Sequence, residues 1–176
     1  MQLGLYRLLA QLDAGRDGAS YRAADAAGNP AEVRVLSGAF ADAVRWKGLS
    51  KRLRLAATFG HPAMLRIQSL ELEHSPPFVA LDWLEGKSLA ESFAQAVPPP
   101  EQGFRIAEEL CGVVAEAHHL GLVHGRLRPA SIRLTDAGGL KLDFTGVEAG
   151  ALDEPEAFAE MSAACVAPEV EAGGPA

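Results

Sequence analysis

The side chains that could carry chemistry in this chain are concentrated in residues 122–134, which read Leu-Val-His-Gly-Arg-Leu-Arg-Pro-Ala-Ser-Ile-Arg-Leu. Arg126 lies near the middle of this segment, between His124 and Ser131. A guanidinium group has no acceptor lone pair and stays protonated at any working pH, so Arg126 cannot be a general base. The segment can therefore contact phosphate through Arg126, but it has no carboxylate that could accept a proton.

The same segment resembles the catalytic loop of the eukaryotic-type (bacterial Hanks-type) serine/threonine protein kinases, H-R-D-L-x-x-x-N. In that family the Asp accepts the proton of the substrate hydroxyl and the Asn holds a magnesium ion. His124 and Pro129 keep the family's residues, whereas Arg126 replaces the catalytic Asp and Ser131 replaces the Asn. The resemblance implies that the frame of the loop is kept and that no catalytic residue remains in it.

Residues 12–23 resemble the glycine-rich loop that covers the nucleotide phosphates in this family, G-x-G-x-x-G-x-V. Gly15 and Gly18 keep the second and third glycines, while Asp13 takes the place of the first and Ser20 that of the valine. A carboxylate at the first position places negative charge near phosphate, which predicts weakened nucleotide binding. The alternative is that Gly15 to Gly18 form only a hairpin turn.

The segment Glu32 to Leu36 alternates as a half-buried strand should, and it resembles the family's V-A-I-K strand with Arg34 at the phosphate-gripping lysine. Arg keeps the charge but is planar and bulkier, so the exchange is not conservative. The alternative is an arginine that faces outward on a sheet. The helix Glu that should pair with this cation falls at or near Arg52, because the sequence has no acid between Ala43 and Leu70. Two arginines repel unless an anion lies between them.

Residues 82–89 resemble the family's hinge, E-Y-x-x-G-x-S-L, with Leu81 at the position that gates the back of the nucleotide pocket. The resemblance implies that backbone groups around Asp82, Trp83 and Leu84 would meet adenine, and backbone recognition survives changes of side chain. ATP, with or without magnesium, therefore remains a weak candidate ligand, and we expect no other cofactor.

The family's metal-binding D-F-G motif aligns with residues 141–147 in two ways. Without a gap, Lys141 fixes the register and Phe144-Thr145-Gly146 occupy the motif, which leaves no carboxylate and no metal site. With one residue deleted, Asp143 and Phe144 become its first two residues. We prefer the ungapped alignment, because a one-residue slip on a strand turns each side chain to the other face. Residues 167–169, Ala-Pro-Glu, match the family's A-P-E motif.

These motifs occur in family order, and the pattern of apolar residues supplies elements to position them. We expect three strands within residues 6–36, a helix over about 41–59, a hairpin over 64–83 that turns at 74–77, a helix over 101–120 ended by Gly121, and a hairpin over 132–142. The predicted fold is α+β and protein-kinase-like. It has an antiparallel β N-lobe with one regulatory helix (residues 1–83), a hinge (84–88) and a partial, mainly α-helical C-lobe (89–176).

Composition limits the classes of partner. The 176 residues include 16 Lys and Arg against 23 Asp and Glu, and the net charge of −7 argues against a general nucleic-acid or anionic-membrane binder. The two cysteines match no metal spacing. The N-terminus lacks the pattern of a signal peptide, and nowhere do about 18 apolar residues follow one another, so we expect a cytoplasmic protein without membrane insertion.

The main hypothesis is a pseudokinase, a catalytically impaired kinase-like domain that acts through a protein partner. One alternative is a weakly active or atypical ATP-dependent enzyme, in which Asp143 holds the metal and Arg34 or Arg126 contacts phosphate. Another is a segment of a larger kinase-like protein with a structural role only. Since the family's C-lobe continues with further helices after the A-P-E motif, we expect the helix over 101–120 to keep an apolar face that a partner or the rest of a longer chain would cover.

Overall fold

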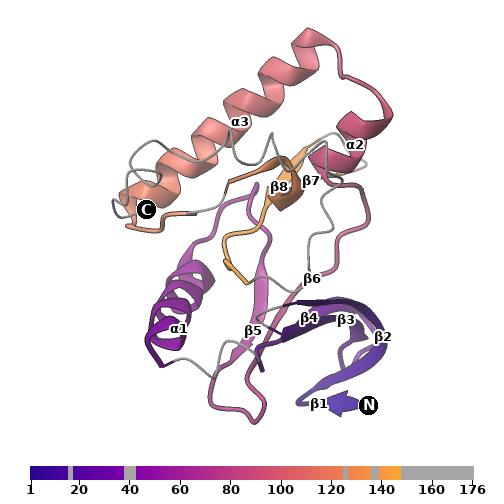
Figure 1. The fold of residues 1–176 in the computed structure, drawn as a ribbon, viewed down its shortest axis with the longest axis vertical. Helices are drawn as coiled ribbons and strands as arrows, with labels where there is room; N and C mark the ends of the chain where they lie inside the picture. The colour runs from indigo at the N-terminus through magenta and orange to yellow at the C-terminus, as the bar shows by residue number, and fades with distance from the viewer. Residues whose placement is uncertain (16–17, 38–42, 125–126, 136–138, 148–176) are drawn as a thin grey trace. The chain divides into compact units, whose positions relative to one another are not determined.

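The computed structural model describes residues 1–15, 18–37, 43–124, 127–135 and 139–147, which are coloured in Figure 1. These residues divide into two compact units. The first contains residues 1–58, 66–83 and the segment that begins at Thr145, and the second contains residues 59–65 and 84–144. The first unit is mainly a curled antiparallel sheet and the second is mainly helical, as the predicted α+β class requires.

The sheet of the first unit has six strands in the order β1-β2-β3-β4-β6-β5, all antiparallel to their neighbours. The three strands expected within residues 6–36 are β2, β3 and β4, and the expected hairpin over 64–83 is β5 with β6. The two-residue strand β1 was not predicted. The strand bounds are β1 Gln2–Leu3, β2 Tyr6–Gly15, β3 Gly18–Ala24, β4 Pro30–Val35, β5 Ile67–Glu71 and β6 Phe78–Asp82.

The two faces of this sheet differ in character because side chains directly opposite one another on neighbouring strands share a face. Ser20 lies opposite Arg34 and Arg22 lies opposite Glu32, so one face carries hydroxyl and charged groups. The other face forms a hydrophobic core of buried side chains, comprising Leu3, Tyr6, Leu8, Ala23, Ala31, Val33, Val35, Phe78 and Ala80. The apolar face stabilises the sheet, and the other face holds two buried polar residues, Ser20 and Arg34.

Helix α1 (Ala43–Thr58) confirms the expected helix over the residues that are described, and it packs against β5 (Figure 1). Leu53 and Ala56, three residues apart on one side of the helix, are buried. The helix contains five Lys and Arg residues and no acid.

In the second unit, α3 (Pro100–His119) confirms the long predicted helix and begins one residue earlier, because proline is well suited to the first helical position. Gly121 has φ +74°, the left-handed conformation expected just beyond a helix end. Ile106, Val113 and Ala117 are buried on one face. Leu120 forms the C-terminal cap and is half exposed.

Helix α2 (Leu89–Gln95) was not predicted, although its start carries a readable signal. The Ser88 hydroxyl accepts from the backbone N–H of Glu91 at 3.1 Å, and the Glu91 carboxylate accepts from the backbone N–H of Ser88 at 2.7 Å. This reciprocal capping box follows from a Ser-x-x-Glu sequence.

The predicted hairpin over 132–142 is present as β7 (Ile132–Leu134) and β8 (Leu140–Leu142), with a short 3-10 helix (Pro129–Ser131) before it. Residues 59–65 join the same unit, since the backbone N–H of Leu65 donates to the carbonyl of Leu142 at 2.9 Å. In the part of the chain that the structure describes, no helix has the length and apolar character needed to cross a membrane.

Candidate functional site

Arg34 on β4 is buried, with 9% of the residue exposed, and its guanidinium already has partners inside the chain. Its Nε lies 2.7 Å from Oε1 of Glu32, and its Nη1 donates to Oγ1 of Thr145 at 3.0 Å. The alternative of an outward-facing arginine is therefore wrong. Glu32, a carboxylate that meets Arg34, lies two residues before it on the same strand.

Arg52, the residue at the predicted helix Glu position, packs against the backbone of Gly146. Gly146 has φ +66°, and a Cβ placed on it would lie 3.0 Å from Cδ of Arg52. The side chains of Arg34 and Arg52 thus both reach the Thr145–Gly146 segment. In a working family member these two positions hold the lysine and glutamate that organise the nucleotide phosphates.

The glycine-rich segment is a tight hairpin in which Gly15 pairs with Gly18 and Asp13 pairs with Ser20. Both sequence interpretations require such a hairpin, and residues 16–17 at its tip lie outside the described residues. Asp13 accepts a hydrogen bond from the backbone N–H of Ala14 at 2.7 Å. Nucleotide contacts by Gly15 and Gly18 remain a prediction.

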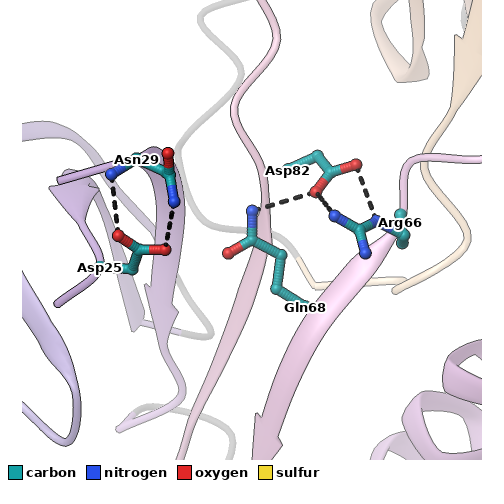
Figure 2. Close-up of polar contacts among 5 residues, drawn as sticks. All are labelled: Asp25, Asn29, Arg66, Gln68 and Asp82. Atoms are coloured by element: carbon teal, nitrogen blue, oxygen red, sulfur yellow. Dashed lines mark hydrogen bonds and ion pairs between the residues drawn. The ribbon is translucent and has the colours of Figure 1, made fainter. Parts of the chain in front are cut away.

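The hinge begins at the end of β6, where Leu81 is fully buried and the Asp82 carboxylate ties β6 to the start of β5. Arg66 donates to Asp82 through Nη2 at 2.9 Å and through Nε at 3.1 Å, and Gln68 donates through Nε2 at 3.0 Å (Figure 2). The hydrogen bonds from Arg66 to Asp82, together with the negative charge of Asp82, raise the pKa of Arg66. The side chain of Asp82 therefore stabilises the strand pair, and only its backbone remains a candidate for adenine recognition.

A second carboxylate drawn in Figure 2 also has a structural role. Asp25 accepts from the backbone and side-chain amides of Asn29 at 2.8 and 2.9 Å, which closes the turn between β3 and β4. Hydrogen bonds from Asn29 lower the pKa of Asp25. An aspartate that closes a turn in this way needs no ligand.

Trp83, the next hinge residue, is covered by Arg22 from the charged face of the sheet. The guanidinium carbon of Arg22 lies 5.1 Å from the centre of the Trp83 ring, a cation–π distance. The indole N–H of Trp83 is buried and has no hydrogen-bond partner among the described residues. Leu84, predicted beside it, is half buried and belongs to the second unit.

In the catalytic-loop segment, Arg126 lies outside the described residues, whereas Ser131 is described. The Ser131 hydroxyl donates to the carbonyl of Arg128 at 2.8 Å and accepts from the backbone N–H of Arg128 at 3.2 Å. Both bonds close the turn that contains Pro129. The hydroxyl at the Asn position therefore holds the loop together.

The segment aligned with D-F-G places an aromatic ring in the core of the second unit. Phe144 is 1% exposed, and its ring centre lies 5.2 Å from that of His124 and 5.7 Å from that of Phe59. In the ungapped alignment this buried ring takes the place of the metal-binding carboxylate. In the shifted alignment that place belongs to Asp143, whose backbone N–H donates to the carbonyl of Ser131 at 3.3 Å. Within the described ranges, no three His, Cys, Asp or Glu side chains come together as a metal site would require.

Three residues of this region were missed by the sequence analysis. Glu32 and Arg22 share a face with Arg34 and could have been found from the two-residue period of β-strands. Thr145 meets Arg34 across more than a hundred residues of sequence, and no local pattern signals such a contact.

No model of a protein family matches the sequence. Among curated proteins, the serine/threonine-protein kinase PknL of Mycobacterium tuberculosis is 27% identical over 148 residues, which cover 82% of this chain. A probable serine/threonine-protein kinase of Corynebacterium efficiens is 25% identical over 97% of the chain. The homologues of this chain are bacterial serine/threonine protein kinases. The chain spans 37% of the length of PknL and 28% of the length of the second kinase.

The kinase-like fold is also seen in solved structures. The crystal structure of the Mycobacterium tuberculosis PknI kinase domain matches the whole chain with a TM-score of 0.74 at 22% identity, and 68% of that domain is covered. This likeness confirms the predicted fold class, an antiparallel N-lobe-like sheet with one helix and a partial helical C-lobe.

Proposed function

We propose that this kinase-like chain is a pseudokinase, which acts by binding another protein and does not transfer phosphate. The observation that carries the proposal is the ion pair between Arg34 and Glu32. The cation at the position of the phosphate-gripping lysine is buried, neutralised by a carboxylate 2.7 Å away and bonded to Thr145. ATP would have to displace that carboxylate or accept its negative charge nearby, and both cost free energy.

The catalytic loop supports the same proposal from its residue types. Arg126 cannot accept a proton, and general-base catalysis alone contributes about 10²- to 10⁴-fold to rate. Ser131 uses its hydroxyl in the turn with Arg128. Loss of the metal ligand and of the charge clamp would remove much of the electrostatic stabilisation on which phosphoryl transfer depends.

A second candidate, a weakly active ATP-dependent enzyme, is favoured by one observation. Asp143 lies beside Ser131 through a backbone hydrogen bond, so in the shifted alignment a carboxylate would stand next to the second metal-ligand position of the family. Asp143 would then hold the metal ion, and Arg34 or Arg126 would contact the phosphates.

A phosphoryl-transfer assay separates the two candidates. The purified chain and its Asp143→Asn variant are each incubated with γ-labelled ATP, magnesium and a mixture of serine and threonine peptides. If the chain is a pseudokinase, it transfers no more labelled phosphate to the peptides than the Asp143→Asn variant does. Transfer of labelled phosphate that is lost in Asp143→Asn contradicts the proposal and supports the weakly active enzyme. Because both proteins are purified in the same way, the comparison also controls for a contaminating kinase.

The remaining functional predictions concern the setting in which the chain acts. We propose a protein partner, which could be an active kinase or the rest of a longer chain, and a cytoplasmic location. The net charge of −7 supports neither a nucleic-acid partner nor an anionic membrane surface.

A further inference from the structure

The link between helices α2 and α3 contains three consecutive prolines, Pro98 to Pro100 (Figure 1). Val97, Pro98 and Pro99 each precede a proline, and a residue in that position is excluded from the α region and adopts an extended or polyproline II backbone. Pro99 has φ −56° and ψ 147°, close to the polyproline II values of about −75° and +145°. The sequence therefore fixes one turn of polyproline II immediately before α3.

Burial along this link follows the three-residue period of a polyproline II helix. Pro98 is half-buried, whereas Ala96, Val97, Pro99 and Pro100 are exposed. Residues three apart share an edge, so Ala96 lies on one edge with Pro99, and Val97 lies on a second edge with Pro100. The edge that carries Pro98 faces the second unit, and the other two edges face away from it.

The exposed edges are apolar and continue onto α3. Val97 is 87% exposed and Phe104, on the first turns of the helix, is 75% exposed. Phe104 lies four residues after Pro100, which places the two on the same side of the helix. The sequence has no charged residue between Glu91 and Glu101. We call residues 97–100 together with Phe104 the proline ridge.

Hydrogen bonds hold both ends of the ridge. The backbone N–H of Ala96 donates to the carbonyl of Ser92 at 3.0 Å, which closes the end of α2. The carbonyl of Pro99 accepts from the backbone N–H groups of Gln102 and Gly103 at 3.0 and 3.1 Å, which opens α3. A segment fixed at both ends and stiffened by proline loses little conformational entropy when a partner binds it.

The start of α3 accounts for only one of the three prolines. Pro100 occupies the first helical position, where its fixed φ and missing N–H suit the helix. Pro98 and Pro99 lie before the helix and supply no backbone donor to the fold. An exposed apolar group of this kind marks an interaction site more often than isolated surface residues do.

We propose that the proline ridge is bound by a partner protein through an aromatic-lined groove of the kind that receives polyproline II segments. Such grooves exploit a ligand backbone that is already formed, which is the property that the link has. Three adjacent prolines cannot donate to a neighbouring strand, so addition of the link to a partner's sheet is disfavoured. The prolines are adjacent and have no P-x-x-P spacing, so the groove must recognise neighbouring prolines.

This inference rests on the proposed function in one respect, because it gives a chain that acts by binding another protein a surface for doing so. The two fail separately in experiment. Binding to the ridge is measured without nucleotide, and phosphoryl transfer is measured without the partner. Phosphoryl transfer by the chain would contradict the pseudokinase and would leave the proline ridge standing.

The test begins with a phage library that displays fragments of the source organism's proteins, selected against the immobilised chain. Selected fragments are purified and titrated against the labelled chain by fluorescence anisotropy. The account predicts that a synthetic proline oligomer of about ten residues displaces these fragments, whereas a glycine–serine oligomer of the same length does not. Since the ridge is uncharged, affinity should change by less than about threefold between about 0.05 M and about 0.5 M salt.

Variants locate the site. Val97→Glu should weaken binding by at least about tenfold, because it places a charge in an apolar contact, and Phe104→Ala should weaken it by about three- to tenfold. The matched control is Val44→Glu, the same change at a valine of α1 that is 84% exposed, and it should alter affinity by less than about twofold. Replacement of both Pro98 and Pro99 by alanine should weaken binding by at least about tenfold, because the backbone is no longer fixed.

The proposal is overturned if no selected fragment loses affinity for Val97→Glu, if Val44→Glu weakens binding as much, or if the proline oligomer fails to displace the fragments at millimolar concentration. Selection of fragments of this chain itself would also contradict it, since the ridge would then serve self-association. Where the double proline variant loses its fold, Val97→Glu and the competition experiment still decide, because Val97 is a surface residue and the competition uses the unaltered chain.

Discussion

Removal of the Glu32 carboxylate tests the ion pair on which the proposed function rests. Glu32→Ala removes a carboxylate that lies 2.7 Å from the Arg34 guanidinium, at a site where only 11% of the arginine side chain and 20% of the glutamate side chain are exposed. Arg34 keeps its hydrogen bond to Thr145, so the charge is not left without any acceptor.

The magnitude follows from these contacts. Hydrogen bonds to charged groups contribute about 1.5–3 kcal/mol, and removal of one partner of a fully buried pair costs about 3–5 kcal/mol. Because Thr145 remains and both side chains are partly exposed, we expect the free energy of unfolding to fall by about 2–3 kcal/mol. For a chain of this size each kcal/mol lowers the thermal midpoint by about 2–4 °C, so a fall of about 4 °C or more is expected.

Urea unfolding of a double-mutant cycle measures the pair directly. The cycle combines Glu32→Ala with Arg34→Met, and Glu71→Ala, an exposed glutamate of the same sheet, serves as the matched control with an expected change within about 0.5 kcal/mol. We expect a coupling energy of about 2 kcal/mol between Glu32 and Arg34. A coupling below about 0.5 kcal/mol, or a cost for Glu32→Ala no larger than that of the control, would refute the argument that Arg34 is neutralised inside the chain.

Two further predictions concern the second unit. Phe144→Ala should lower the free energy of unfolding by about 3–5 kcal/mol in urea, since a fully buried ring is lost, whereas Phe104→Ala on the exposed side of α3 should change it by no more than about 0.5 kcal/mol; equal effects would contradict the burial of Phe144. Hydrogen bonds from the backbone and hydroxyl of Ser88 lower the pKa of Glu91 in the folded chain. These bonds therefore stabilise the fold above the pKa of an unfolded glutamate, about 4.3, and this stabilisation is lost as the pH falls through the lower pKa of the folded state. Stability measured between about pH 5 and about pH 3 should therefore fall more steeply in the unaltered chain than in Glu91→Gln, and parallel curves would contradict the capping box.

Much of the fold could be predicted because the pattern of apolar residues and the order of the kinase-like motifs along the chain indicate the same elements. The alternation from Glu32 to Leu36 identified β4, the helical period located α1 and α3, and Gly121 marked the end of α3. Helix α2 has only seven residues, too few for a helical period to stand out, and its capping box from Ser88 to Glu91 overlaps the end of the hinge motif. The strand β1 has two residues, too few for any period to appear in the sequence.

The site was less predictable, because its contacts join residues that are distant in sequence. The sequence identified Arg34 as the important cation and predicted that Arg52 could not pair with it, but it did not predict the hydrogen bonds of Arg34 to Glu32 and Thr145. The first could be inferred from the strand period, but the second depends on how the chain returns to the sheet after β8. The packing of Phe144 against His124 is likewise a tertiary contact between two predicted motifs that were interpreted separately.

The measurement that tests the central claim most directly is a thermal-unfolding scan of the purified chain with millimolar ATP, with and without magnesium. A ligand that binds the folded state at 100 times its dissociation constant stabilises it by about 2.7 kcal/mol, which the scan would register as a clear rise in the midpoint. The account predicts no shift in either condition, because Arg34 is already paired and the metal ligands are replaced. A rise that requires magnesium would contradict it and would identify Asp143 as a metal ligand in the shifted alignment.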